Sequence, residues 1–434
     1  MFNLINGDCL EELDKLKENS IDSIVTDPPY ELNFMGKGWD NAGISFQKET
    51  WEKCLRVLKP GGYLLAFGGS RTFHRIACAI EDAGFEIRDT IMWLYGSGFP
   101  KSMNIGLAID KKNGVESKVV ATGKSGAKET HQNSLNLVKN PFGGEYEIKE
   151  AQNEWNGWGT ALKPSFEPII VARKPFKGSL VDNVIEYGVG GINIDDCRVP
   201  LESNYEYKET NRQHRTEDTV FNDNNSNFKN ETNNIAVASP KGRFPANTIL
   251  TYDETDFDEV CGGFPETKSG VAVRHNSGGN TFGGNNKKPP MSDLGYRDSG
   301  NACRYFYCAK ASKKDRDEGC DTLKDGLLRR MRPDKDDSNP TGLNKEGRFA
   351  PVVRKNTHPT VKPTSLMQYL VRLVSPKGAT ILDPFMGSGS TGKAVAYENL
   401  ERNVNYKFIG IEKEKEYCDI AEARINYVKN KMGE

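Results

Sequence analysis

The stretch Ile21-Asp22-Ser23-Ile24-Val25-Thr26-Asp27-Pro28-Pro29-Tyr30 decides the fold of this 434-residue chain. Its first part is a short apolar and β-branched run, and two consecutive prolines follow that have no N–H to donate to a strand ladder. This pattern predicts a buried parallel strand over 21–26 whose carboxyl end opens onto a rigid loop. Open α/β sheets bind their ligands at that edge, so the loop after Thr26 is the first candidate for a functional site.

The loop itself suits a flat heterocycle that carries an exocyclic amino group. Pro28 and Pro29 leave their backbone carbonyls free to accept hydrogen bonds, and Asp27 adds an ionised acceptor. Tyr30 adds an aromatic face for stacking. An amino group presents two N–H donors and its ring presents a π-face, so adenine and cytosine both fit. A proline-capped strand end with an ordinary turn aspartate is the alternative interpretation.

A second motif, near the carboxyl terminus, predicts a cradle for a nucleotide-like ligand. Thr380-Ile381-Leu382-Asp383-Pro384-Phe385-Met386-Gly387-Ser388-Gly389 has the pattern of a buried strand and a glycine turn that opens a helix. A further expected strand over 406–411 ends in Glu412, a carboxylate that can accept hydrogen bonds from both ribose hydroxyls. The sequence does not fit a phosphate loop, because Gly392-Lys393 is followed by Ala394 instead of a hydroxyl residue.

Two shorter motifs also lie at expected helix starts. Asn6-Gly7-Asp8-Cys9 stands between an expected strand over 2–5 and a helix with leucines at 10, 13 and 16, where Asp8 is also a candidate N-cap. His358-Pro359-Thr360-Val361-Lys362-Pro363-Thr364 leads into an amphipathic helix, whose N-terminus and Lys362 form a positive environment.

Together these motifs resemble the β group of amino-methylating DNA methyltransferases, the N4/N6 DNA methylase family. The resemblance covers about 1–94, 165–174 and 303–434, with the catalytic loop before the glycine loop. It implies an α/β, Rossmann-like class I S-adenosylmethionine-dependent methyltransferase sheet with permuted motif order and a large inserted target-recognition region. The catalytic residues that it implies are Asp27, Pro28, Pro29 and Tyr30. The S-adenosylmethionine-binding residues that it implies are Asp8, Cys9, Lys362, Thr364, Asp383, Pro384, Phe385, Gly387, Ser388, Gly389 and Glu412.

The resemblance also implies methyl transfer to N6 of adenine in double-stranded DNA, with the base flipped out and stacked on Tyr30. Asp27 favours adenine, since family members that act on cytosine N4 more often have serine there. Cytosine N4 stays open, and an RNA or protein amino-methyltransferase or a non-catalytic DNA-binding protein are further alternatives. Family members often form homodimers, and the sequence leaves open both a homodimer and a cognate restriction endonuclease as partners.

The alternation of strands and helices over 2–94 predicts a parallel sheet and suggests where the chain divides. We expect a catalytic half over 1–95, a loop insertion over 96–164, a sheet strand over 165–174, a target-recognition region over 175–302 and a cofactor-binding half over 303–434. Within the insert, 204–234 and 275–301 are too poor in apolar residues to order themselves and are expected to be flexible loops. The basic residues expected to contact DNA there are Arg212, Arg215, Lys241, Arg243, Lys287 and Lys288.

Bulk properties agree with an intracellular enzyme. The net charge of −1 does not exclude DNA as a partner, because phosphate binding depends on where the cations lie. The nine cysteines form no CxxC pair, so we expect free thiols in a reducing compartment and no metal site. The sequence shows neither a signal peptide nor a membrane-spanning run, and we expect a cytoplasmic, DNA-associated protein of a prokaryotic or phage-infected cell.

Overall fold

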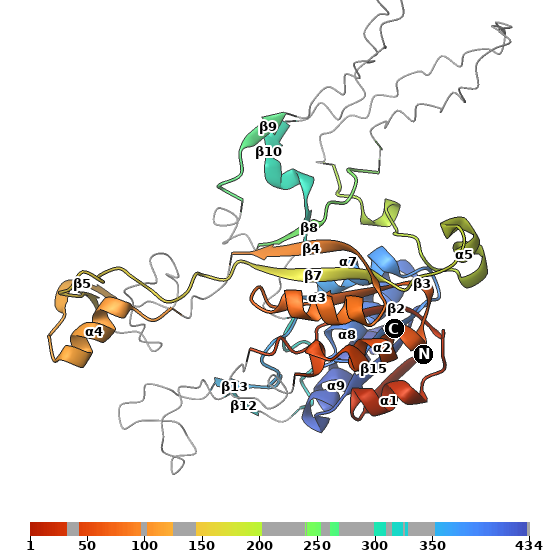
Figure 1. Ribbon diagram of the computed structural model, residues 1–434, viewed down its shortest axis with the longest axis horizontal. Coiled ribbons are helices and arrows are strands. Elements are labelled where there is room, and N and C mark those ends of the chain that lie inside the picture. The colour runs from red at the N-terminus through yellow and green to blue at the C-terminus, as the bar shows by residue number, and fades with distance from the viewer. Residues whose placement is uncertain are drawn as a thin grey trace, which may run out of the picture.

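A mixed sheet of nine strands forms the centre of the molecule, in the order β1-β15-β14-β2-β3-β7-β4-β8-β11 (Figure 1). The computed structural model describes residues 1–32, 43–96, 102–124, 145–201, 239, 241–252, 261–268, 299–309, 315–323, 326–328 and 352–431. The sheet strands are β1 (Phe2–Asn6), β2 (Ile21–Thr26), β3 (Leu58–Phe67), β4 (Glu86–Tyr95), β7 (Phe166–Arg173), β8 (Thr248–Thr251), β11 (Tyr307–Cys308), β14 (Thr380–Asp383) and β15 (Lys407–Glu412).

The pairing of the strands confirms the predicted methyltransferase-type sheet. Five strands that are consecutive in the sheet, β1, β15, β14, β2 and β3, pair in parallel with one another. The next strand, β7, runs antiparallel to both β3 and β4. The strand predicted over 165–173 is therefore the antiparallel member of the sheet. The strand β3 starts at Leu58 opposite Ile21 and shifts register before Tyr63.

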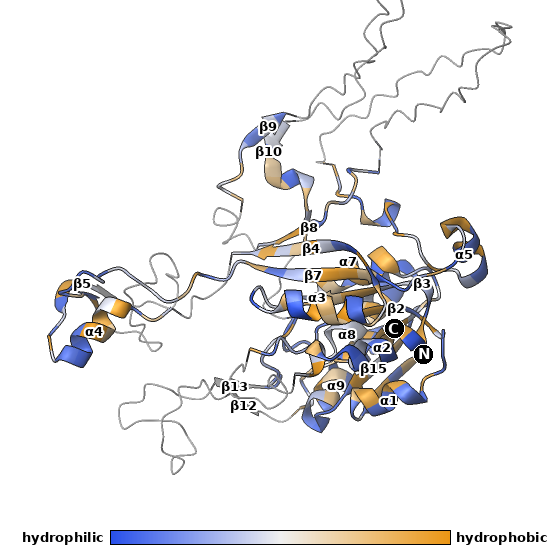
Figure 2. Cartoon of the chain, viewed as in Figure 1, coloured by the Kyte–Doolittle hydropathy of each residue, from blue (hydrophilic) through white to orange (hydrophobic). Residues whose placement is uncertain are grey.

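Helices cover both faces of the sheet and bury its alternating side chains. On one face Val25 and Leu65 pack with residues of α7, α8 and α9, and on the other Ile24 and Leu64 pack with residues of α1, α2 and α3. Figure 2 shows hydrophobic residues along the central strands. The helices are α1 (Cys9–Lys15), α2 (Lys48–Val57), α3 (Phe73–Asp82), α7 (Thr364–Val374), α8 (Ser390–Arg402) and α9 (Lys415–Lys431). None of the helices described is long and apolar enough to cross a membrane.

The order of the strands in the sheet differs from their order in the chain, as expected for a methyltransferase sheet whose motifs are permuted in sequence. The strands β14 and β15 come last in the sequence but lie between β1 and β2, and Leu382 of β14 pairs with Ile24 of β2. The loops that follow β2 and β14 therefore leave the sheet side by side at its carboxyl edge.

The segment expected as a loop insertion over 96–164 has secondary structure of its own. It contains α4 (Ile105–Asn113) and an antiparallel pair, β5 (Lys118–Lys124) and β6 (Glu145–Glu150). These elements stand away from the main sheet (Figure 1). Asn104 caps α4 and Gly114 ends it with φ +70°, which are local signals that the polar composition obscured. The two tryptophans of the segment, Trp155 and Trp158, contact each other with ring centres 5.1 Å apart.

The region expected for target recognition, 175–302, also contributes to the main sheet. Within it lie α5 (Leu180–Tyr187), the sheet strand β8 between β4 and β11, and a two-stranded sheet of β9 (Glu266–Lys268) and β10 (Ser299–Asn301). A further pair joins β12 (Gly326–Leu328) to β13 (Val352–Arg354). Most of the two segments expected to be flexible, and Arg212, Arg215, Lys287 and Lys288, lie outside the described residues.

The other two basic residues proposed for DNA contact are engaged within the protein. Arg243 is 5% exposed, pairs through its backbone with Val199 and places its guanidinium over the Tyr305 ring. Lys241 is exposed but forms an ion pair of 2.7 Å with Asp195. The expectation that Arg243 reads DNA from an exposed loop is therefore wrong, because its side chain is buried.

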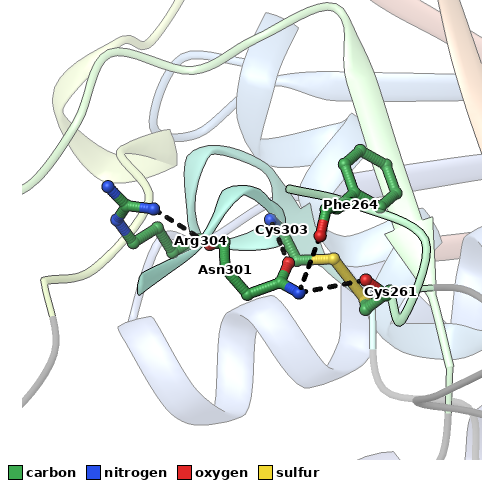
Figure 3. The surroundings of a disulfide bond; sticks show 5 residues. All are labelled: Cys261, Phe264, Asn301, Cys303 and Arg304. Carbon is green, nitrogen blue, oxygen red and sulfur yellow. Dashed lines mark hydrogen bonds between the residues drawn. A yellow bond between two sulfur atoms is a disulfide. The ribbon is translucent and has the colours of Figure 1, made fainter. Parts of the chain in front are cut away.

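The expectation that every cysteine is a free thiol is also wrong for one pair. Cys261 and Cys303, 42 residues apart in sequence, form a disulfide beside β10 (Figure 3). Asn301 lies next to the bond and donates a hydrogen bond of 3.1 Å to the Cys261 carbonyl. The scattered spacing of the cysteines gave no indication of this pair, because the pairing of β9 with β10 brings the two segments together. The other seven cysteines, all within the described residues, form no disulfide.

Candidate active site

One cavity of about 890 Å³ lies at the carboxyl edge of the sheet and is lined by both predicted motif loops. Tyr30 from the loop after β2 and Phe385 from the loop after β14 both face it, which confirms that the two motifs meet. The predicted residues in its lining are Asp8, Cys9, Asp27, Pro28, Pro29, Tyr30, Lys362, Asp383, Pro384, Phe385, Gly387, Ser388 and Glu412.

The loop after β2 is held in shape from its far side. Glu31 has a left-handed backbone, with φ +55°, and its carboxylate accepts hydrogen bonds from the backbone N–H groups of Gly43 and Ser45. The Ser45 hydroxyl donates in turn to the Pro29 carbonyl at 2.6 Å. Residues 33–42, which follow this loop, lie outside the described part of the chain. Glu31 thus links the loop after β2 to the backbone at Gly43 and Ser45.

Asp27 presents one engaged and one unengaged carboxylate oxygen. Its Oδ2 accepts a hydrogen bond of 2.7 Å from Lys362 Nζ. Its Oδ1 is buried and has no hydrogen-bond partner among the described residues. Burial raises the pKa of this carboxyl above its ordinary value, while the Lys362 ammonium opposes the increase. A buried acceptor without a donor is unfavourable unless a ligand supplies one.

Lys362 lies in the cavity wall, but not where the sequence placed it. Its Nζ is 2.7 Å from Asp27 Oδ2, 3.2 Å from Glu167 Oε2 and 3.1 Å from the Tyr30 hydroxyl. It also sits over the ring of Phe67, 4.9 Å from the centroid. The resemblance implied that Lys362 binds S-adenosylmethionine, but within the described residues its ammonium instead contacts Asp27, Tyr30 and Glu167.

Glu167 of β7 is a site residue that the sequence analysis missed. Its Oε2 accepts a hydrogen bond of 2.7 Å from the Tyr30 hydroxyl, and its Oε1 lies 3.4 Å from the Tyr95 hydroxyl. Burial and the nearby carboxylates raise the pKa of Tyr30 well above its ordinary value, so the phenol remains protonated and donates. A single carboxylate within the otherwise apolar strand 166–171 was the signal available in the sequence.

The other half of the cavity begins at Asp383, where β14 ends. This carboxylate is 2% exposed and accepts hydrogen bonds of 2.6 Å from the hydroxyls of Thr26 and Thr391. The Phe385 N–H donates to it at 3.1 Å. Burial raises its pKa to about 6 despite these donors. Asp383 therefore acts from within the loop, fixing the turn that leads into the glycines.

The turn itself approaches the cavity with its backbone. Gly387 has φ +53°, and a Cβ on it would lie 2.8 Å from His358 Nε2, so a larger residue would narrow the cradle. The Gly387 N–H donates to Glu412 Oε2 and the Glu414 N–H to Glu412 Oε1, both at 2.8 Å. The carboxylate of Glu412 is thus oriented by backbone donors at the end of β15, and its remaining lone pairs can accept from a ligand.

His358 is a second lining residue that was missed as a site residue. Its ring packs edge-on against Tyr417 with centroids 4.6 Å apart, and its Nδ1 lies 2.9 Å from the Thr360 carbonyl. Burial lowers its pKa to about 3, so the imidazole is neutral at physiological pH. It forms an uncharged wall beside the glycine turn.

Asp8 and Cys9 line the cavity where α1 starts. Asp8 Oδ1 accepts from the Leu10 N–H at 3.0 Å, so Asp8 is the N-cap of α1 as predicted, and its Oδ2 lies 3.1 Å from Lys413 Nζ. Burial raises the pKa of the Cys9 thiol to about 12, which makes Cys9 an apolar wall and not a nucleophile.

Two predicted residues, Thr364 and Gly389, do not line the cavity. The Thr364 N–H donates to Asp315 Oδ2 at 2.6 Å, at the start of α7. Gly389 is the N-cap of α8 with φ +75°, and it packs against Ala421 of α9. Both residues support the loops from behind.

A buried charged cluster supports the glycine turn from the same side. Arg424 Nη1 donates to the Ser388 carbonyl at 2.6 Å. Asp315 faces Lys393 Nζ at 2.6 Å, and both cations of this cluster are fully buried. The segment that carries Asp315 follows the large insert, so the insert is anchored to the back of the cradle.

Comparison with known proteins identifies the family. A family model described as DNA methylase matches residues 21–423. The chain belongs to the N4/N6 DNA methylase family.

Individual relatives of this DNA methylase are type II methyltransferases. The chain is 45% identical over 218 residues to M2.LlaDCHI of Lactococcus lactis subsp. cremoris, covering 44% of this chain and 78% of that protein. It is 25% identical over 232 residues to M.HindIII of Haemophilus influenzae, covering 44% and 64%. It is 37% identical over 108 residues to M.HpaI of Haemophilus parainfluenzae, covering 23% and 33%. The chain thus spans less than two thirds of M.HindIII and of M.HpaI.

Solved structures with distant similarity are also methyltransferases. The M1.HpyAVI–SAM complex matches with 15% identity and a TM-score of 0.36, covering 98% of this chain and 100% of that one. The cytosine-N4-specific PvuII DNA methyltransferase matches with 12% identity and a TM-score of 0.40, covering 99% and 92%.

Proposed function

We propose that this DNA methylase transfers a methyl group from S-adenosylmethionine to the exocyclic N6 of adenine in double-stranded DNA, with the base rotated out of the helix. The observations that carry the proposal are that Asp27 lines the same cavity as the glycine cradle and that its buried Oδ1 has no hydrogen-bond partner among the described residues. An amino group is the donor that this oxygen lacks.

The donor half of the cavity fits S-adenosylmethionine in shape and chemistry. A backbone turn at Gly387 that a side chain would obstruct allows close approach, and the Glu412 carboxylate can accept from ribose hydroxyls. The rings of Phe385 and the neutral His358 provide apolar walls. Ligand sites of about 300–1,000 Å³ hold drug-sized molecules, and 890 Å³ lies at the upper end of that range. When bound, S-adenosylmethionine supplies an electrophilic methyl group.

The catalytic loop then activates the amine. The amine lone pair is delocalised into the base, so the nitrogen is a poor nucleophile until it becomes tetrahedral. Asp27 Oδ1 accepts one N–H and the Pro28 carbonyl the other, and both favour the tetrahedral geometry. The negative carboxylate stabilises the positive charge that develops on the nitrogen, and its raised pKa suits it to take the proton that the nitrogen releases.

Adenine is proposed over cytosine on the identity of Asp27, because related loops for cytosine N4 more often begin with serine. Cytosine carries the same pair of N–H donors, so the base must be identified chemically. A base stacked inside a duplex cannot reach this cavity, which supports flipping onto Tyr30. We further predict that the protein lies inside the cell, and that its partners include a second copy of the chain and a cognate restriction endonuclease.

The test uses the purified full chain with radiolabelled S-adenosylmethionine and unmethylated DNA amplified from a bacterial genome. The products are digested to nucleosides and identified by mass spectrometry. We expect N6-methyldeoxyadenosine; N4-methyldeoxycytidine would correct the base, and label in RNA but not in DNA would refute DNA as the substrate.

A variant pair then tests the role of Asp27. Asp27→Ala should abolish methyl transfer while S-adenosylmethionine still binds in a calorimetric titration, since the glycine cradle is intact. The matched control is Asp14→Ala, which removes an exposed carboxylate paired with Lys53 and should leave turnover unchanged. Unchanged turnover in Asp27→Ala would remove Asp27 from the mechanism.

A further inference from the structure

The inference concerns the charged cluster beneath the catalytic loop and rests on the proposed function. One ammonium, Lys362, lies between two carboxylates, those of Asp27 and Glu167, at 2.7 and 3.2 Å. The three groups come from three distant segments: the loop after β2, the antiparallel strand β7 and the approach to α7. The Lys362 side chain is 7% exposed, so the cluster is largely removed from water.

We infer that Glu167 is a positioning residue for methyl transfer: through Lys362 and Tyr30 it orients the Asp27 carboxylate and keeps the cluster net negative. With Glu167 present, one positive and two negative charges leave an excess negative charge beside the amine. Without it, Lys362 would neutralise Asp27 alone, and the acceptor facing the base would be weaker.

The hydrogen bonds define how the orientation is transmitted. Glu167 Oε2 accepts from both the Tyr30 hydroxyl and Lys362 Nζ, so a single oxygen aligns the stacking ring and the ammonium. Lys362 then binds Oδ2 of Asp27, whereas Oδ1 has no hydrogen-bond partner among the described residues. Glu167 is held by the β7 ladder, where it pairs with Trp93 of β4.

Charged and titratable groups reach this cluster from every neighbouring element. They are Lys362 and His358 from the approach to α7, Glu167 from β7, Tyr95 from β4, Tyr30 from the catalytic loop and Asp383 from β14. Of those acting on Asp27, the Lys362 ammonium lowers the pKa of its carboxyl and Glu167 raises it. Removing either partner should therefore move the acid limb of the pH–rate profile, in opposite directions.

The experiment compares Glu167→Gln with Lys362→Gln in the full chain, with S-adenosylmethionine and the DNA substrate above. For Glu167→Gln we expect kcat to fall roughly 10- to 100-fold, the acid limb to move to lower pH, and the KM for S-adenosylmethionine to stay unchanged. For Lys362→Gln we expect the acid limb to move to higher pH. A merely structural role would lower stability without opposite shifts.

The matched control is Glu86→Gln, at the other end of the same strand ladder. Glu86 pairs with Arg173 of β7 at 2.5 Å, far along the strand from Glu167, and should keep the wild-type kcat and acid limb. Circular dichroism shows whether Glu167→Gln folds. If it does not, Glu167→Asp, which keeps the charge, is compared with Lys362→Gln. We then expect the acid limb of the pH–rate profile of Glu167→Asp to match that of the wild type.

The outcomes separate the two proposals. Wild-type methylation of DNA together with an unchanged kcat and acid limb in Glu167→Gln would overturn the inference and leave the proposed function standing. Shifts of the same sign in both variants would also overturn it. A wild-type chain that methylates no base in DNA would overturn both.

Discussion

Gly389 offers a stability test in which conformational strain and steric overlap can be separated. It has φ +75°, and a Cβ on it would lie 2.7 Å from the Cβ of Ala421 and 2.9 Å from its Cα. Ala421 belongs to α9 and is fully buried, so the helix itself would have to move. Gly378 has a nearly identical φ of +79°, but a Cβ there would meet nothing within 4 Å. Alanine substitutions at Gly378 and Gly389 would therefore introduce the same backbone strain, but only the one at Gly389 would overlap with a neighbouring residue.

The magnitudes follow from these two contributions. A left-handed alanine costs about 1–2 kcal/mol, and the reduced freedom of the unfolded chain returns about 0.4–1 kcal/mol. Gly378→Ala should therefore lower the free energy of unfolding by about 1 kcal/mol. Forcing an extra methyl group into a close-packed contact adds about 1–3 kcal/mol. Gly389→Ala should therefore lose about 2–4 kcal/mol.

Equilibrium urea unfolding of wild type and both variants, followed by circular dichroism, measures the difference, provided that the slopes agree. Gly389 lies outside the cavity, so its loss should appear in stability whether or not S-adenosylmethionine is added. Equal losses in Gly378→Ala and Gly389→Ala would refute the reasoning, because the overlap with α9 would then have no energetic effect.

Two further outcomes are expected. Asp383 has a folded-state pKa of about 6, above the ordinary value of 3.8, so the native state binds more protons and stability should fall as pH rises from about 4 to 6. The free energy of unfolding of the wild type should fall by about 3 kcal/mol over this range, and that of Asp383→Asn should not show this fall. If the urea midpoints of wild type and Asp383→Asn differ by the same amount at every pH, the prediction is contradicted. Asp315→Ala should cost about 1.5–3 kcal/mol, because the fully buried Lys393 loses its carboxylate partner at 2.6 Å and keeps that of Glu318, at 2.8 Å. The control Asp419→Ala, which breaks an exposed pair with Lys415, should cost less than about 0.5 kcal/mol in the same denaturation, and equal costs would argue against burial as the cause.

The strands that position the site could be predicted because each carries a local signal. The run that forms β2 ends before two prolines, β14 ends at Asp383 before a proline and two glycines, and β15 ends at Glu412. Strand propensity and chain breakers act over a few residues, so a sequence window contains them. Their meeting at one cavity then follows from the rule that parallel strands present their carboxyl ends at the same edge.

The electrostatic partners could not be predicted in the same way. Lys362 and Asp27 are 335 residues apart, and no periodicity links them. Lys362 precedes a helix N-terminus, and this local position favours binding of an anionic ligand. In the fold its ammonium instead contacts the carboxylates of Asp27 and Glu167. The short strand β8 was missed because its four residues lie inside a polar insert. Tertiary contact decides such cases.

The permuted order of the motifs has no effect on the geometry of the site, because sheet neighbours set that geometry. Thr26, the last residue of β2, donates a hydrogen bond of 2.6 Å to Asp383, the last residue of β14, across 357 residues of sequence. Adjacent strands lie about 4.8 Å apart, so the loop after β2 and the glycine cradle begin one strand spacing from each other. The same proximity places the carboxylates of Asp27 and Asp383 close enough for Asp27 to raise the pKa of Asp383 further. The two halves of the cavity are therefore electrostatically coupled as well as adjacent, and a change of charge at one half should be felt at the other.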